Sequence, residues 1–493
     1  MKVPLGHKAL VIAVGGLVAA SLTACNNDEA HKPVTVTGPR AEPTAGQWKP
    51  WVLASSSDIA VPPPPSKDSA IYQADLARVA TAARMRTPAD VATVQKWSPP
   101  LPTRPWTQTA FELVSSTPSN PPLAARNYAL VQTAMYDAVV SSWHYKYLYN
   151  VPPPAGVETA VPAGPDPSYP SEHAAIAGAA SRLLAFLYPD IPLSRFDQLA
   201  DVAATSRITA GTNTPADTEA GLALGRAIAD RVIARAKADG AGAIWDGQRP
   251  PGIGIPPAYW APPPGPVVPS ATPMAATWKT WVLTSGNQFR PPAPPAYGTP
   301  EFRAAAQEVV DIGANLTPEQ EGIAKRWDGG EGTKGAAGLI IDAYSADIEK
   351  AATTGPVPAR FTVPRTVRAL ALLSIALADE GVAVWDAKFA YWNPRPETAI
   401  SDLRVAAGWR PLVPTPVSPA YPSLGAGSAG AAETVMSYLL PHSSDAFAAR
   451  AEEQTTASLW GGTDWRYDSI SRDSGRQVGI LVVERAKADG AGP

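Results

Sequence analysis

The sequence is written twice, and this repetition limits the possible folds more than any other feature. WKPWVL at 48–53 recurs as WKTWVL at 278–283, and RAKADG at 235–240 recurs at 485–490. Matches between these ends keep their order while their offset changes in small steps. They pair Thr87 with Thr317, Trp97 with Trp327, Arg126 with Arg368, Asp137 with Asp379, Trp143 with Trp385, Lys146 with Lys388, Tyr169 with Tyr421 and Asp217 with Asp468. Ordered matches of this kind indicate a tandem duplication.

The repeat divides the chain of 493 residues into two units at 48–245 and 278–493, joined by a Pro-rich linker at 246–277. The 55 prolines are about twice the usual share. Because proline interrupts helices and central strands, we expect them in the connections and motif loops of the two units.

Within each unit, apolar residues recur at the i, i+3, i+4 spacing of an amphipathic helix. The stretches with this period are 127–143, 171–187, 218–238, 369–385, 425–440, 445–459 and 471–488. Thr87-Pro88 and Thr317-Pro318 have the pattern of an N-cap followed by proline at the first helical position. Alternating strand patterns are absent. The sequence therefore predicts an all-α fold of two helical bundles related by internal duplication.

The first residues have the pattern of an export signal. Lys2 and Lys8 precede an apolar run at 9–20, which is too short to span a membrane. The LTAC sequence ending at Cys25 resembles the bacterial lipoprotein box. This resemblance implies a signal peptide at 1–24, lipid attachment at Cys25 and, because Asn26 follows, the outer membrane. An ordinary secretory signal with an incidental cysteine is the alternative.

The expected product is a lipid-anchored protein of the periplasm or cell surface, with residues 25–47 as a polar, flexible tether. The formal net charge of −3 argues against nucleic acid as the main partner, since phosphate binding needs a basic surface. A single cysteine excludes a disulfide framework and a CxxC zinc site. Five histidines leave few positions for histidine chemistry.

Three short blocks recur in both units. The second unit has Lys388 and, after six residues, Arg395-Pro396, then Tyr421-Pro422-Ser423, then Ser458, Asp464 and Asp468. The first unit has Lys146 and Pro153, then Pro170-Ser171-Glu172-His173, then Ser206-Arg207, Asn213 and Asp217. These blocks resemble the Lys-x6-Arg-Pro, Pro-Ser-Gly-His and Ser-Arg-x5-His-x3-Asp pattern of the vanadium-dependent haloperoxidase and type 2 phosphatidic acid phosphatase superfamily. The likeness extends over most of 278–490.

The resemblance implies a haloperoxidase-like fold and a pocket for an oxyanion. Lysine and arginine neutralise the anion, and serine adds a donor at a helix start. One histidine attacks phosphorus or binds vanadium, an aspartate orients that histidine, and a second histidine acts as the acid–base. The matching anion-binding positions are Lys146, Arg207, Lys388, Arg395 and Ser423. The matching catalytic positions are His173, Ser171, Asp217, Asp464 and Asp468.

The chain departs from this pattern at important positions. Asn213 and Asp464 stand where the superfamily has the nucleophilic or vanadium-binding histidine. Gly425 or a neighbour stands where the second unit needs its acid–base histidine. Asparagine cannot form a phosphoenzyme. Asp464 could be phosphorylated or bind a metal, but it could not hold vanadate in the superfamily's way. The resemblance therefore assigns no cofactor with certainty, and vanadate stays open as a doubtful candidate.

The other histidines offer no replacement. His144 lies two residues before Lys146, which on a helix points it about 200° away. His442 follows a proline in a loop, His7 is in the signal peptide and His31 in the tether. We expect surface or packing roles for these residues, and a core position for Trp143 and Trp385.

A purely structural interpretation of the pockets is also open. Lys146 and Arg207 could pair with Glu172 and Asp217. The corresponding pairs in the second unit would join Lys388 and Arg395 to Asp464 and Asp468.

Three functions therefore compete. The first is an envelope protein with oxyanion-pocket residues and altered or lost ancestral activity. The second is an active phosphoester hydrolase or haloperoxidase. The third is a repurposed acid–base enzyme that acts on a small anionic substrate through His173.

Overall fold

The computed structural model describes residues 42–117, 120–262, 272–330, 332–354 and 360–492. The predicted signal peptide, Cys25, His7, His31 and most of the predicted tether lie outside these residues. The described residues form helices and connecting loops, without a β-strand among them. Within the same residues, no helix has both the length and the apolar character needed to cross a membrane.

The first half of the chain contains η1 (Ala45–Gln47), α1 (Ala70–Arg84), α2 (Pro88–Trp97), α3 (Arg104–Ser116), α4 (Pro121–Tyr149), α5 (Glu172–Leu187), α6 (Leu193–Thr209) and α7 (Pro215–Lys237). The second half contains η3 (Pro273–Thr277), α8 (Pro300–Ala314), α9 (Pro318–Arg326), α10 (Gly335–Thr353), α11 (Val363–Tyr391), α12 (Pro396–Asp402), α13 (Leu424–Leu439), η5 (Pro441–Ser443), α14 (Ser444–Trp460), η6 (Arg466–Ile470) and α15 (Ser471–Lys487). The all-α prediction is confirmed.

Every stretch predicted to be helical lies within a helix, apart from one or two terminal residues. These helices are α4, α5, α7, α11, α13, α14 and α15. The predicted N-caps are also confirmed, because the Thr87 and Thr317 hydroxyls each accept a hydrogen bond of 3.2 Å from the backbone N–H three residues on. Proline follows each cap as the first helical residue of α2 and α9.

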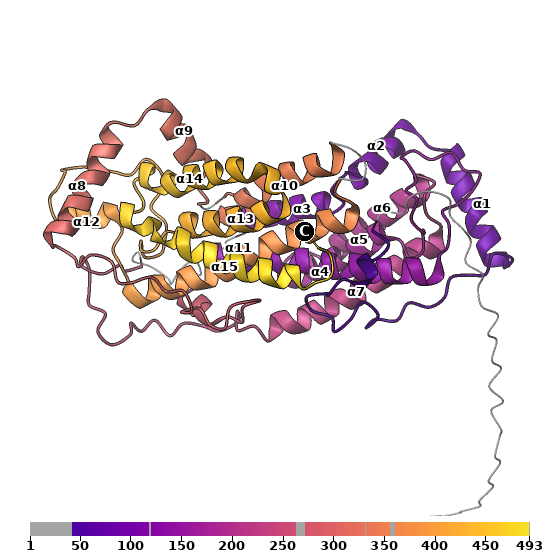
Figure 1. The fold of residues 1–493 in the computed structure, drawn as a ribbon, viewed down its shortest axis with the longest axis horizontal. Helices are drawn as coiled ribbons and strands as arrows, with labels where there is room; N and C mark the ends of the chain where they lie inside the picture. The colour runs from indigo at the N-terminus through magenta and orange to yellow at the C-terminus, as the bar shows by residue number, and fades with distance from the viewer. Residues whose placement is uncertain (1–41, 118–119, 263–271, 331, 355–359, 493) are drawn as a thin grey trace, which may run out of the picture. The chain divides into compact units, whose positions relative to one another are not determined.

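Helices α4 and α11 form the centre of the fold. Each has 29 residues, and buried residues occur on all of its faces, as expected for a helix enclosed by others. The two helices pack against each other (Figure 1). The α5–α7 pair covers α4, and the α13–α15 pair covers α11. One continuous cluster of buried apolar side chains extends through both halves.

Glycine allows the paired helices to approach closely. A Cβ atom on Gly225 of α7 would overlap the Ala175 carbonyl oxygen of α5. A Cβ atom on Gly475 of α15 would overlap the Gly427 carbonyl oxygen of α13 in the same way. The backbones are therefore in contact at these positions, and this contact fixes where α5 and α13 begin relative to α7 and α15.

Asp137 and Asp379 hold the opening segment of each half in the same way. The Asp137 carboxylate accepts hydrogen bonds of 2.8–3.2 Å from the three backbone N–H groups of 51–53. The Asp379 carboxylate accepts bonds of 2.7–3.1 Å from those of 281–283. Positions that the sequence repeat pairs thus make matching contacts, which supports the duplication.

Each opening segment also touches the end of the other half. The Lys49 N–H donates to the Asp489 carbonyl (2.7 Å), and the Lys279 N–H donates to the Asp239 carbonyl (2.8 Å). The rings of Trp51 and Trp281 meet edge to face, with their centroids 6.0 Å apart. The two halves are therefore joined at both of their ends.

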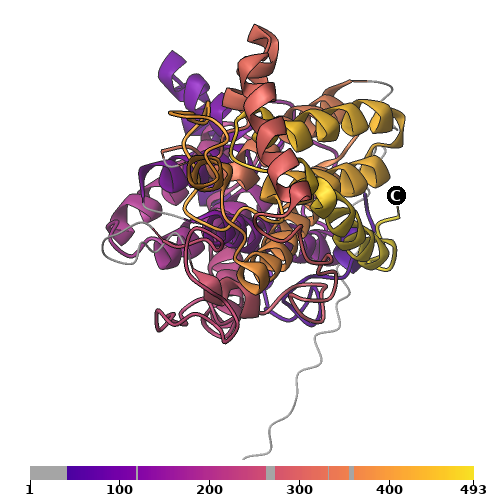
Figure 2. The ribbon, with the colours of Figure 1, turned by 90° about the vertical axis from the view of Figure 1, so that its left-hand side faces the viewer.

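The segments outside the two predicted units are partly folded. Residues 45–47 form η1, which packs on α4, so the described structure is ordered before the predicted unit boundary at Trp48. In the predicted linker, the buried Trp260 donates its backbone N–H to the Trp392 carbonyl (2.7 Å). Figures 1 and 2 show the described part of 246–299 passing along the lower side of the helices, mostly as irregular chain.

Candidate functional site

Both candidate pockets are built around the start of a helix. Ser171 and Ser423 are the buried N-caps of α5 and α13, and each hydroxyl accepts a hydrogen bond from the backbone N–H three residues on. The Ser171 N–H donates to the Asp217 carbonyl (2.9 Å), and the Ser423 N–H donates to the Asp468 carbonyl (3.0 Å). These bonds bring the second and third sequence blocks together in each half, as the resemblance implies.

A carboxylate lies inside the first pocket. Glu172, the first residue of α5, accepts from Lys146 through Oε2 (2.8 Å) and contacts His173 Nδ1 through Oε1 (2.9 Å). Lys146 comes from the last turn of α4 and also donates to the Pro167 carbonyl (2.5 Å). Lys146 and His173 therefore already have a negatively charged partner.

Arg207 completes the first pocket from the last turn of α6. Its Nη1 donates to the Ser98 hydroxyl (2.5 Å), and its buried Nε has no hydrogen-bond partner among the described residues. Burial lowers the pKa of this guanidinium, and the Glu172 charge opposes that effect in part. Arg207 thus faces the Glu172 charge without a direct ion pair.

The electrostatics of the first pocket fix its protonation. Burial favours neutral Glu172, but Lys146 and His173 hold the pKa of its carboxyl well below the usual range. Burial lowers the pKa of His173, and the Arg207 charge lowers it further. At neutral pH, Glu172 is therefore ionised and His173 is neutral.

Asp217 and Asn213 have mainly structural contacts. Asp217 caps α7 by accepting from the Thr214 N–H (2.8 Å), and burial raises the pKa of its carboxyl to about 6. Asn213 donates its side-chain amide to the Ser168 carbonyl (3.0 Å).

In the second pocket, Arg395 is held entirely by the chain. Its guanidinium donates to the Ser418 carbonyl (2.7 Å) and hydroxyl (2.8 Å), to the Thr463 carbonyl (3.0 Å) and to Asp464 Oδ1 (2.5 Å). Arg395 and Asp464 are both buried. The Asp464 carboxylate thus pairs with the cation that the resemblance assigns to an oxyanion.

Lys388 and Asp468 complete this second pocket. Lys388 donates to the Pro419 and Ala420 carbonyls, each at 2.7 Å. Burial, together with the Arg395 charge, lowers the pKa of Lys388 to about 7. Asp468 Oδ2 accepts from a backbone N–H, while Oδ1 is buried and has no hydrogen-bond partner among the described residues. Burial and the neighbouring Asp464 raise the pKa of Asp468 well above its usual range.

Two of the ion pairs that the structural interpretation expects are present, Lys146–Glu172 and Arg395–Asp464. Arg207 instead bonds to a serine, and Lys388 bonds to backbone carbonyls. No hydrogen bond or ion pair among the described residues joins the first pocket to the second. We therefore treat them as separate sites.

The other described histidines and the paired tryptophans lie outside the two pockets. The His144 ring packs on Tyr145, with centroids 4.8 Å apart, and His442 is exposed in η5. Trp143 and Trp385 are buried in the core, as predicted. Ser98 and Ser418 belong to none of the three sequence blocks, and Glu172 was expected only as an ion-pair partner. The signal for Glu172 was its position where the superfamily has glycine.

Comparison with known proteins identifies the fold. Neither a protein-family model nor a curated protein matches the chain. Among solved structures, a bacterial vanadium-dependent iodoperoxidase matches with a TM-score of 0.60 and 22% identity, covering 77% of this chain and 94% of that one. The apo form of a bacterial vanadium-dependent chloroperoxidase matches with a TM-score of 0.57 and 18% identity, covering 80% and 97%. Its holo form gives 0.54 and 17%, covering 77% and 96%.

The chain therefore has the vanadium-haloperoxidase fold, as its sequence motifs imply. Its pocket residues do not fit vanadate, because Glu172 and Asp464 already neutralise cations in the two pockets. Among the described residues, no cluster of three or more His, Cys, Asp or Glu side chains could hold a metal ion.

Proposed function

We propose that this chain is an envelope protein that retains the haloperoxidase fold but has lost the superfamily's turnover. The observation that supports this most is the position of Glu172, bound to both Lys146 and His173. Asp464 on Arg395 provides the same feature in the second pocket. Each carboxylate supplies the negative charge that a bound oxyanion would otherwise bring.

A phosphate or vanadate ion would compete with these carboxylates for the same cations. An entering phosphate or vanadate would have to break a buried ion pair and would leave two negative groups close together, which is unfavourable at low dielectric. Asn213 cannot form a covalent bond to phosphorus, and Asp464, whose carboxylate accepts from Arg395, cannot hold vanadate as a histidine ligand does. The two pockets are therefore structural ion-pair networks that keep several residues of the superfamily's active-site motif.

The test combines activity and binding. We expect the unmodified protein to show neither vanadate-dependent bromination nor p-nitrophenyl phosphate hydrolysis, and no heat of phosphate binding by calorimetry. Glu172→Gln leaves Lys146 and Arg207 unneutralised, so this variant should bind phosphate. Glu219→Gln, at an exposed position of α7, is the matched control. Turnover by the unmodified protein, or phosphate binding that Glu172→Gln does not strengthen, would contradict the proposal.

A second candidate function is acid–base chemistry at His173 on a small anionic substrate. It is favoured by the Glu172–His173 contact, because a carboxylate beside one ring nitrogen orients an imidazole for proton transfer. The His173 side chain retains 13% exposure. Under this function, His173→Ala would abolish hydrolysis of the anionic substrate p-nitrophenyl phosphate without lowering the melting temperature. Equal rates in both proteins would exclude it.

The lipid anchor belongs to the same proposal. The LTAC sequence supports attachment of lipid at Cys25 and an outer-membrane location. Radiolabelled palmitate should enter the protein, and Cys25→Ser should abolish labelling and release the protein from the membrane fraction. Labelling that survives Cys25→Ser would contradict the anchor.

A further inference from the structure

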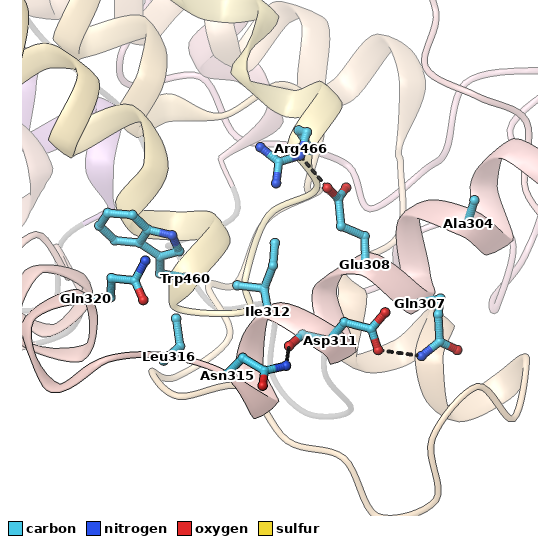
Figure 3. A pocket seen from close by; sticks show the side chains of 10 residues that line it. All are labelled: Ala304, Gln307, Glu308, Asp311, Ile312, Asn315, Leu316, Gln320, Trp460 and Arg466. Carbon is cyan, nitrogen blue, oxygen red and sulfur yellow. Dashed lines mark hydrogen bonds and ion pairs between the residues drawn. The ribbon is translucent and has the colours of Figure 1, made fainter.

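A cleft of about 650 Å³ lies outside both pockets, between α8, the start of α9 and the end of α14 (Figure 3). Its volume is within the range of about 300–1,000 Å³ that is typical of small-molecule sites. Trp460 and Arg466 line the cleft, and in the sequence they precede and follow the loop 461–465, which contains Asp464. The cleft thus borders the second pocket without including its residues.

One part of the cleft is aromatic and apolar. Trp460 is only partly buried, and Ile312 and Leu316 of α8 and its following loop line the same cleft. Figure 3 shows all three side chains projecting into the cleft space. A partly exposed indole beside aliphatic carbons offers a flat apolar surface with one N–H donor.

The other part is polar and held in place by internal bonds. Gln307 donates to the Asp311 carboxylate (2.9 Å), and Asn315 donates to the Asp311 carbonyl (2.7 Å). Arg466 pairs with Glu308 (2.5 Å). The amides of Gln307 and Asn315 both donate and accept hydrogen bonds, whereas the carboxylates only accept and the guanidinium only donates. These internal bonds set the positions of the groups before a ligand arrives.

The charge of the lining restricts the ligand. Two carboxylates, Glu308 and Asp311, against one guanidinium, Arg466, leave one net negative charge. This disfavours an anion and separates the cleft from the oxyanion pockets. A wholly apolar ligand would leave the planar polar groups without water or partners, which is costly.

We propose that this cleft binds a neutral carbohydrate, with a pyranose ring stacked on Trp460. The C–H face of a pyranose matches the indole platform. Its hydroxyl groups each donate and accept, as do the amides of Gln307 and Asn315. The inference does not depend on the state of either oxyanion pocket.

The full-length protein can be titrated with chitotetraose, cellotetraose and maltotetraose by calorimetry and by saturation-transfer NMR. We expect saturable binding of at least one of them, weakened about tenfold by Trp460→Ala. Trp327→Ala is the matched control, because Trp327 lines a separate cleft of about 520 Å³ near Arg450. Its binding should equal that of the unmodified protein.

Gln307→Ala guards against a folding defect, because Gln307 is exposed and its one side-chain bond is to Asp311. This variant should also bind the sugar more weakly at an unchanged melting temperature. The proposal is overturned if none of the three sugars binds, or if binding survives both Trp460→Ala and Gln307→Ala. It is also overturned if choline, a cationic probe for the same indole, binds and the sugars do not.

Discussion

At the scale of single residues, Glu172 and Asp464 act alike from different places in the sequence. Glu172 follows the N-cap serine of α5, whereas Asp464 lies in the loop after α14. Each forms an ion pair with a cation of the motif, buried for Asp464 and largely buried for Glu172. A buried pair of this kind stabilises little in total, but removing one partner is costly because it strands a charge. The pockets can therefore persist as structure without a ligand.

Glu380 is a fully buried carboxyl without a cationic partner among the described residues. It projects from α11 against Gly427, receives one hydrogen bond of 3.3 Å from Ser474, and leaves Oε2 unpaired. Burial, with a smaller contribution from Asp379, raises the pKa of Glu380 well above its usual range. Burial therefore favours the protonated, neutral form of this side chain in the folded protein.

This protonation predicts how stability depends on pH. Since the folded-state pKa is raised, the contribution of Glu380 to stability is complete below the ordinary glutamate pKa, near 4.3, and is lost as pH rises toward the folded value. Glu380→Gln should remove that loss, gaining up to about 1.4 kcal/mol per pH unit within this window. Urea unfolding from pH 4 to 8 measures it.

Glu484→Gln, at an exposed position of α15, is the control for that series and should leave the pH profile unchanged. A Glu380→Gln profile parallel to that of the unmodified protein would show that Glu380 ionises normally.

At the scale of helices, the closest contacts are made by glycine. Gly225→Ala should push α7 away from α5, because the added methyl group overlaps the Ala175 carbonyl. We expect a loss of about 1–3 kcal/mol in the free energy of unfolding, measured by urea titration. Gly322→Ala is the control, since a Cβ atom there meets no heavy atom within 4 Å. That change should be neutral or stabilise α9 by up to about 1 kcal/mol. Equal effects of the two changes would contradict the packing argument.

The helices were largely predictable because their apolar period is strong. α4 and α11 are enclosed, and α5, α7, α13 and α15 each have a continuous buried face. α6 was not predicted, and neither were α1, α3, α8, α10 and α12. Half of the buried residues of α6 are alanines, at positions 200, 203 and 204, and another is Arg207, which gives little contrast with the exposed side.

The site was predictable only where a motif fixed it. Lys146, Ser171 and His173 were placed together by their resemblance to a known pattern. The contact between Arg207 and Ser98 joins residues 109 positions apart and follows from the packing of α6 on α2. A local sequence pattern cannot predict that contact, and it cannot predict the contact between Arg395 and Ser418 either.

At the scale of the whole molecule, the two halves exchange contacts. The Arg235 guanidinium lies 3.7 Å from the centroid of the Trp281 ring, and Arg485 lies 4.7 Å from that of Trp51. Each arginine ends one half, and each tryptophan opens the other. Together with the shared core, these contacts make separate unfolding of the halves unfavourable.

Calorimetry should therefore show a single unfolding transition, with equal calorimetric and van't Hoff enthalpies. Arg235→Ala should lower its midpoint without splitting it, at a cost of about 1–2 kcal/mol from the lost cation–π contact and buried packing. Arg182→Ala, on the exposed side of α5, is the matched control. Two resolved transitions in the unmodified protein would show that the halves are independent.

The reciprocal bonds Lys49–Asp489 and Lys279–Asp239 have a topological consequence. The two halves meet at two equivalent junctions: residues 240–278 connect one of them covalently, and at the other residue 49 meets residue 489 without a covalent link. A circular permutant that joins residue 489 to residue 49 and begins and ends within 246–262 would contain the same two halves and the same two junctions. The contacts that join the halves therefore do not depend on which half comes first in the chain.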